Sequence, residues 1–223
     1  MPEPRARIVA LVSGQGRNLQ ALIDACSAGH IAGDLVGVLS NRAAAPALAR
    51  AQAAGIATRV VPHDDYPDRE AFDTALAASI DAFEPGIVVL GGFMRVLGDA
   101  FVQRYTGRMI NIHPSLLPRY PGLRTHQRAL EAGDAEHGAT VHFVTGQLDG
   151  GAPVIQGRVS VQAEDSPEIL ASRVMNEVEI RILPQTVAWM AEGALSLGDT
   201  RALLRGEAIE TPLQLADLDE RFR

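Results

Sequence analysis

The sequence predicts an α/β protein with a doubly wound, mostly parallel sheet, followed by a C-terminal antiparallel extension and a long helix. Runs of strand length alternate with Ala-rich helical stretches through the first two thirds of the 223 residues. These runs are apolar on both faces, which is typical of parallel strands covered by helices. The expected parallel strands are Ile8–Val12, Leu35–Leu39, Arg59–Val61, Ile87–Leu90 and Met109–Ile112.

The stretches between these strands carry small or apolar residues at three- and four-residue spacing, and most end at Gly or Pro, which favours helices. They are Asn18–Ala28, Pro46–Ala54, Arg69–Phe83 and Asp99–Tyr105. After Pro114 we expect a short helix at Thr125–Ala132, then antiparallel strands at Ala139–Val144 and Pro153–Val161, because these two runs alternate with period two.

A long helix is expected to begin after Ser166, since Ser-Pro-Glu places a capping hydroxyl, a proline and an acid at its start. Its apolar stripe should continue until Pro184, where the missing N–H is expected to interrupt the helix. The acidic tail after Gly198 carries no motif that predicts a role.

Composition excludes several kinds of chemistry. All 20 basic residues are Arg, so Schiff-base, pyridoxal-phosphate and lysine phosphate-loop mechanisms are excluded. The single cysteine, Cys26, allows no internal disulfide, and the net charge of −7 argues against a nucleic-acid partner. Met1–Arg7 and the short apolar run after it predict neither a signal peptide nor a membrane span, so we expect a cytoplasmic protein.

A glycine-rich loop, Ser13–Asn18, joins the first strand to the first helix, where backbone amides favour a phosphate. The loop lacks the third glycine of a dinucleotide fingerprint, and Asn41-Arg42 stand where a carboxylate would bind a ribose diol. The loop therefore predicts a phosphate monoester site, with Arg17 adding a cation and Asn18 capping the helix. A turn that binds nothing is the alternative.

Asn111 and His113 end the fifth strand on one face, at the sheet edge where such folds bind ligands. Both side chains can donate to an oxyanion, and the imidazole can transfer a proton, which indicates acyl transfer. Asp149, between Leu148 and Gly150, would favour the imidazolium form if it reached His113. A structural strand-end histidine and a plain Asp-Gly turn are the alternatives. The remaining histidines show no metal-ligand spacing, so we expect no metal.

Four ordered motifs resemble those of the phosphoribosylglycinamide formyltransferases, a folate-dependent family of purine biosynthesis. They are Ser13–Asn18, Gly92–Leu97, Asn111–Pro118 and the pair His142–Val144 and Leu148–Gly151, and the resemblance extends from about Ile8 to Pro184. It implies a Rossmann-like formyltransferase fold and transfer of formyl from 10-formyltetrahydrofolate to glycinamide ribonucleotide.

The resemblance also implies roles for individual residues. The implied catalytic residues are Asn111, His113 and Asp149; the ribonucleotide residues are Gly16, Arg17, Asn18 and Glu179; the folate residues are Arg69, Met94, Arg95, Val96, Leu97 and Asn111. Arg17 stands where the family carries a small serine.

We expect one domain over residues 1–223, with a phosphate- and ribonucleotide-binding half (1–105), a catalytic and folate-binding half (106–195) and a tail (196–223). The expected partners are small-molecule substrates, with no nucleic acid or membrane, in a monomer or homodimer. Formyltetrahydrofolate hydrolase, methionyl-tRNA formyltransferase and a non-catalytic phosphate-binding α/β protein are the alternatives. The tRNA enzyme is disfavoured because the chain ends soon after Pro184 and is acidic.

Overall fold

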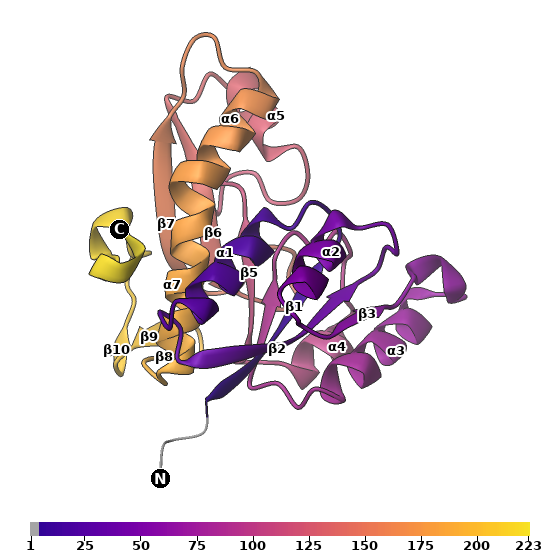
Figure 1. Ribbon diagram of the computed structural model, residues 1–223. Coiled ribbons are helices and arrows are strands. Elements are labelled where there is room, and N and C mark those ends of the chain that lie inside the picture. The colour runs from indigo at the N-terminus through magenta and orange to yellow at the C-terminus, as the bar shows by residue number, and fades with distance from the viewer. Residues whose placement is uncertain (1–4) are drawn as a thin grey trace.

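The computed structural model describes residues 5–223 and contains a seven-stranded sheet in the order β3-β2-β1-β4-β5-β6-β7 (Figure 1). The first five strands pair in parallel, and β6 and β7 pair antiparallel. The strands are β1 (Ala6–Val12), β2 (Gly33–Ser40), β3 (Thr58–Val60), β4 (Ile87–Leu90), β5 (Met109–His113), β6 (Glu136–Phe143) and β7 (Pro153–Ser160). The predicted fold class is confirmed, including the antiparallel extension.

Helices cover both faces of the sheet, as the two-sided apolar strands predict. The helices between the strands are α1 (Arg17–Ser27), α2 (Pro46–Ala53), α3 (Arg69–Asp81), α4 (Asp99–Arg104) and α5 (Thr125–Glu131). On one face, Ile8, Ala10 and Val12 share a core with α1 and α2. On the other, Val9 and Leu11 share a core with α3 and α4. Alternate residues of one strand therefore supply two separate cores.

The long helix begins as predicted, because the Ser166 hydroxyl accepts a hydrogen bond from the Ile169 N–H. It consists of α6 (Pro167–Val174), a π-helical turn (Met175–Glu179) and α7 (Ile180–Ala191). Pro184 lies inside α7 and removes one helix hydrogen bond as expected, but the expected end of the buried stripe there is wrong, since α7 continues beyond it. Ile182, Leu183 and Val187 are fully buried around the proline. This packing outweighs the loss of about 3 kcal/mol that a proline costs inside a helix.

The tail forms a small antiparallel sheet of β8 (Leu195–Leu197), β9 (Ala202–Leu204) and β10 (Glu207–Ala208). Leu213 then exchanges backbone hydrogen bonds with Val154 and Gln156, so the tail covers the free edge of β7. Leu218 and Phe222 return to the main core. No helix within residues 5–223 is long and apolar enough to cross a membrane. The prediction made for Met1–Arg7 falls partly on residues 1–4, outside the described residues.

Candidate active site

The predicted phosphate loop lies at the switch point of the sheet, between the carboxyl ends of β1 and β4. Gly16 adopts φ 74° directly before α1, and a Cβ there would lie 2.5 Å from the Cβ of Ala47, so glycine is required. The helix begins at Arg17, one residue earlier than predicted. The expected capping role of Asn18 is therefore wrong, because Asn18 is the second helical residue and makes no cap.

Ser13 joins the phosphate loop to the segment that follows β4. Its hydroxyl donates to Asn41 Oδ1 at 2.5 Å and accepts from the Met94 N–H at 2.8 Å. The Ser13 N–H also donates to the Gly92 carbonyl at 3.1 Å. Hydrogen bonds thus connect the predicted ribonucleotide segment to the predicted folate segment at the switch point.

Asn18 and Glu179, 161 residues apart, form one buried pair. The Asn18 amide donates to Glu179 Oε2 at 2.7 Å, and Glu179 is only 5% exposed. Burial raises the pKa of the Glu179 carboxyl, while the bond from Asn18 and the nearby Arg17 lower it. Glu179 ends the π-helical turn, a feature often found at functional sites. The exposed Arg17 donates to Asn176 on the same turn.

Asn111, His113 and Asp149 meet at the end of β5. His113 Nδ1 lies 3.4 Å from Asp149 Oδ2, and both side chains are less than a tenth exposed. His113 Nε2 lies 2.9 Å from the Tyr120 carbonyl, so this nitrogen carries a proton and donates. Both ring nitrogens therefore face an oxygen, Nε2 the Tyr120 carbonyl and Nδ1 the Asp149 carboxylate. The sequence left open whether Asp149 reaches His113, and in the structure the two side chains are in contact.

The backbone fixes Asp149 in an uncommon conformation, with φ 50°. Asp tolerates this left-handed region better than most residues. Its Oδ2 accepts the Gly122 N–H at 2.8 Å, which ties the carboxylate to the proline-rich loop after β5. That loop and the Asp149 loop therefore close around His113 together.

His142 belongs to this cluster as well, although the sequence predicts no role for it beyond its place in the His142–Val144 motif. Its Nε2 lies 3.2 Å from Asn111 Nδ2 and 3.8 Å from Asp149 Oδ1. Its Nδ1 donates to the Phe143 carbonyl, which leaves Nε2 as the acceptor for the Asn111 amide. Burial lowers the pKa of His142, which favours this neutral form. The His142–Val144 motif was the sequence signal, and the cross-strand register that pairs Asn111 with His142 explains their contact.

The predicted folate residues gather on the segment after β4 and the start of α3. Met94 and Val96 are 54% and 57% exposed, an unusual exposure for large apolar side chains beside a site. The Arg95 guanidinium lies 5.9 Å from the centre of the Phe72 ring. Asp73 accepts the Gly98 N–H, and Arg69 and Arg95 both lower its pKa against a larger rise caused by burial.

A second histidine pair supports the loop above the cluster. His137 Nε2 lies 3.1 Å from His126 Nδ1, and His137 is almost fully buried. Burial lowers the pKa of His126 to about 4, and it also lowers the pKa of His137. The pair is therefore neutral at pH 7 and connects α5 to β6.

The fold and this site define a class: α/β proteins with a glycine-containing loop at the switch point, beside an Asn–His–Asp arrangement whose residue types suit acyl transfer. Residues 6–187 match the formyl transferase family, so the chain belongs to that family.

The chain is 49% identical to a phosphoribosylglycinamide formyltransferase of Escherichia coli, over 94% of this chain and 99% of the relative. The solved phosphoribosylglycinamide formyltransferase of Coxiella burnetii is 46% identical, with a TM-score of 0.89 over 95% of this chain and 99% of that one. A formyltetrahydrofolate deformylase of Pseudomonas putida is 27% identical, with a TM-score of 0.81 over 92% of this chain and 71% of that one.

Proposed function

We propose that the protein transfers the formyl group of 10-formyltetrahydrofolate to the amino group of glycinamide ribonucleotide, in purine biosynthesis. The observation that carries the proposal is the buried His113–Asp149 pair, with the half-buried Asn111 two residues before His113 on β5, in a chain that matches relatives with this activity over nearly their whole length. The loop follows β1 and the pair lies at the end of β5, with only β4 between these strands, which supports a two-substrate crevice.

The ribonucleotide phosphate would bind the amides of the loop at Gly16 and the N-terminus of α1, with Arg17 adding charge. The ribose would lie toward Glu179, whose carboxylate can accept from hydroxyl groups. A Cβ added to Gly91 would lie 3.7 Å from the Asn18 Cβ, so the folate segment borders this half of the site. The folate ring would lie along Met94–Leu97, with Arg69 and Arg95 available to its carboxylates.

The reaction begins when the amine nitrogen of the ribonucleotide attacks the formyl carbon and forms a C–N bond. The carbonyl electron pair moves to oxygen, and Asn111 and the His113 imidazolium donate to that oxyanion. A proton leaves the attacking nitrogen and a proton reaches N10 of the folate. The bond from N10 to the formyl carbon then breaks, which gives formylated ribonucleotide and tetrahydrofolate.

His113 has to exchange one hydrogen bond to take part. Its two nitrogens face the Tyr120 carbonyl and Asp149. Catalytic hydrogen bonds are often made only in the complex. During the reaction the Tyr120 contact would be exchanged for one to the oxyanion, and the Asp149 contact would be kept to orient the ring.

The test supplies both proposed substrates and follows three products: formylated ribonucleotide, tetrahydrofolate and formate. The proposal expects the first two in equal amounts, with formate absent. Formate formed without formylated ribonucleotide would establish the hydrolase alternative, for which the likeness to a deformylase is the favouring observation. Binding of the ribonucleotide without any product would leave a phosphate-binding protein.

A further inference from the structure

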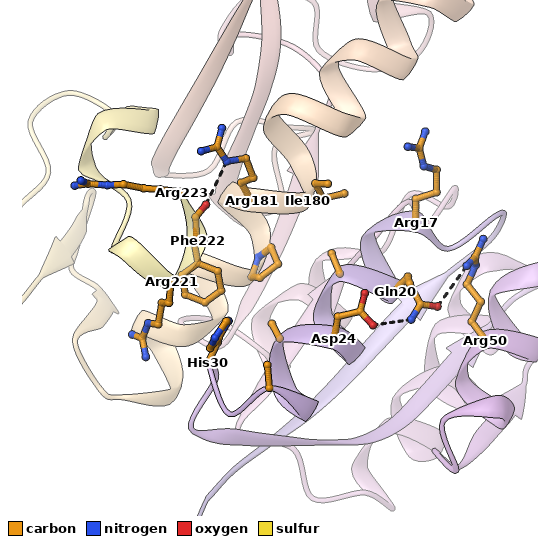
Figure 2. A pocket seen from close by; sticks show the side chains of 14 residues that line it. Arg17, Gln20, Asp24, His30, Arg50, Ile180, Arg181, Arg221, Phe222 and Arg223 are labelled. Atoms are coloured by element: carbon orange, nitrogen blue, oxygen red, sulfur yellow. Dashed lines mark hydrogen bonds between the residues drawn. The ribbon is translucent and has the colours of Figure 1, made fainter.

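A cavity of about 530 Å³ lies outside the proposed catalytic site, between α1, α7 and the C-terminal segment (Figure 2). Its floor is apolar, formed by alanines of α1 together with Ile180, Pro184 and Phe222. Phe222 packs edge-on against His30, with ring centres 5.9 Å apart, so the tail closes one end. The remainder of its wall is charged.

The charge of this wall is opposite to that of the chain. The wall contains five arginines and one carboxylate, Asp24, in a protein of net charge −7. Arg221 pairs with Glu192 and Asp219, outside the wall. Within residues 5–223, Arg17, Arg50 and Arg181 form no ion pair.

Two of these arginines border the proposed ribonucleotide site, and the third lies toward the tail. Arg17 belongs to the phosphate loop, and Arg50 Nε donates to the Gln15 carbonyl of that loop at 2.8 Å. Arg181 follows Glu179 by two residues on the same helix and donates to the Phe222 carbonyl at 3.2 Å. Figure 2 shows Arg17 and Arg50 at one end of the cavity and Arg181 beside the tail. The cavity thus carries basic side chains both at the loop and toward the tail.

We propose that this wall is the electrostatic approach path for the phosphate of the ribonucleotide, with Arg50 beside the loop and Arg181 acting from farther away. The inference rests on the proposed function and adds a second role for side chains outside the catalytic cluster. An acidic chain repels an anionic substrate, and a local cationic wall reverses the potential where the substrate enters. Since screening removes such effects beyond the Debye length, they are lost at high salt.

The test measures kcat/KM for the ribonucleotide at about 20 mM and about 1 M salt, for the unchanged protein, Arg50→Gln, Arg181→Gln and the double variant. Interaction of a phosphate dianion with a charge about 10 Å away in water predicts a loss of about two- to fourfold for Arg181 at low salt, depending on screening, and at least as large a loss for Arg50, which lies beside the loop. At 1 M salt, where the Debye length is about 3 Å, the values should converge. The maximal turnover should stay unchanged.

Arg50→Lys and Arg181→Lys keep the charge and alter the hydrogen bonds to Gln15 and Phe222. They should retain the low-salt rate, whereas loss of rate in the Lys variants at both salts would assign the residues a purely structural role. Arg59→Gln is the matched control, because Arg59 is an exposed, unpaired arginine on β3 that stacks on Phe83 and should change nothing. Equal salt dependence in the double variant and the unchanged protein would overturn the inference.

Calorimetric titration of the ribonucleotide at both salts separates the two proposals. If the protein binds the ribonucleotide with a salt dependence that requires Arg50 and Arg181, but does not formylate it, then only the proposed function is refuted. If the protein formylates the ribonucleotide, but the salt dependence of kcat/KM is the same without Arg50 and Arg181, then only the approach path is refuted. No binding of the ribonucleotide would overturn both.

Discussion

Replacing Glu179 by Gln tests whether the long helix binds the ribose hydroxyls through this carboxylate. The side chain keeps its shape, and the Gln amide oxygen can still accept from Asn18, which now donates at 2.7 Å. What is lost is the negative charge. A hydrogen bond to a charged acceptor contributes about 1.5–3 kcal/mol and a neutral one about 0.5–1.5 kcal/mol. The midpoints of these ranges differ by about 1.25 kcal/mol, which predicts a rise of about eightfold in the ribonucleotide KM.

The same structure predicts that this variant stays folded. Glu179 is 5% exposed, and burial raises its pKa, which means that the fold disfavours its charged form. A neutral amide removes that penalty, so the melting temperature should stay level or rise. Because the carboxylate form is needed for ribose binding, the ribonucleotide KM of the unchanged protein should also increase as pH falls toward the raised pKa. That increase should be absent in Glu179→Gln.

The assay is steady-state formylation with each substrate varied in turn, and Glu177→Gln serves as the control on the same helical turn, since Glu177 is exposed. The folate KM should not change in either variant. Equal increases in the two KM values for Glu179→Gln would mean that the helix supports the whole crevice, and the ribose assignment would be withdrawn.

Four further predictions follow from the site. His113→Ala should lower turnover about 10²–10⁴-fold with little change in either KM, and near-normal turnover in the folded variant would remove His113 from the mechanism. Asp149→Asn retains an acceptor for the Gly122 N–H and should lower turnover and displace the pH profile of turnover. Normalised pH profiles that superimpose would show that Asp149 does not act through His113. Arg17→Ser should raise the ribonucleotide KM less than tenfold, because an exposed charge contributes about 1 kcal/mol or less, and a rise of several hundredfold would place phosphate recognition on the side chain. Burial lowers the pKa of His126 to about 4, against an ordinary 6.5. As the pH falls, the unfolded chain therefore takes up this proton before the folded protein does. The contribution of His126 to the free energy of unfolding is fully present above pH 6.5 and is lost as the pH falls toward 4. Allowing for partial solvent screening, urea unfolding should lose about 1 kcal/mol between pH 7 and 5, and an equal loss in His126→Gln would refute this origin.

The sequence predicts most of the fold because its signals are local. Two-sided apolar runs identify the parallel strands, and Ser166 predicts the helix start that its hydroxyl caps. Pro184 misled the prediction for the opposite reason. Its local effect is unfavourable, and only the contacts of Leu183 and Val187 with the main core keep the chain helical, which no window of sequence reports.

The candidate site divides along the same line. Asn111 and His113 were predictable as neighbours, since period-two spacing within one strand places them on one face. The contacts that complete the cluster join distant segments. Asp149 reaches His113 only because its left-handed backbone and the Gly122 N–H aim the carboxylate inward, and His142 meets Asn111 through the register of β5 and β6. The buried Asn18–Glu179 pair likewise depends on where the π-helical turn crosses α1, so each of these contacts is a property of packing that the residue pattern cannot supply.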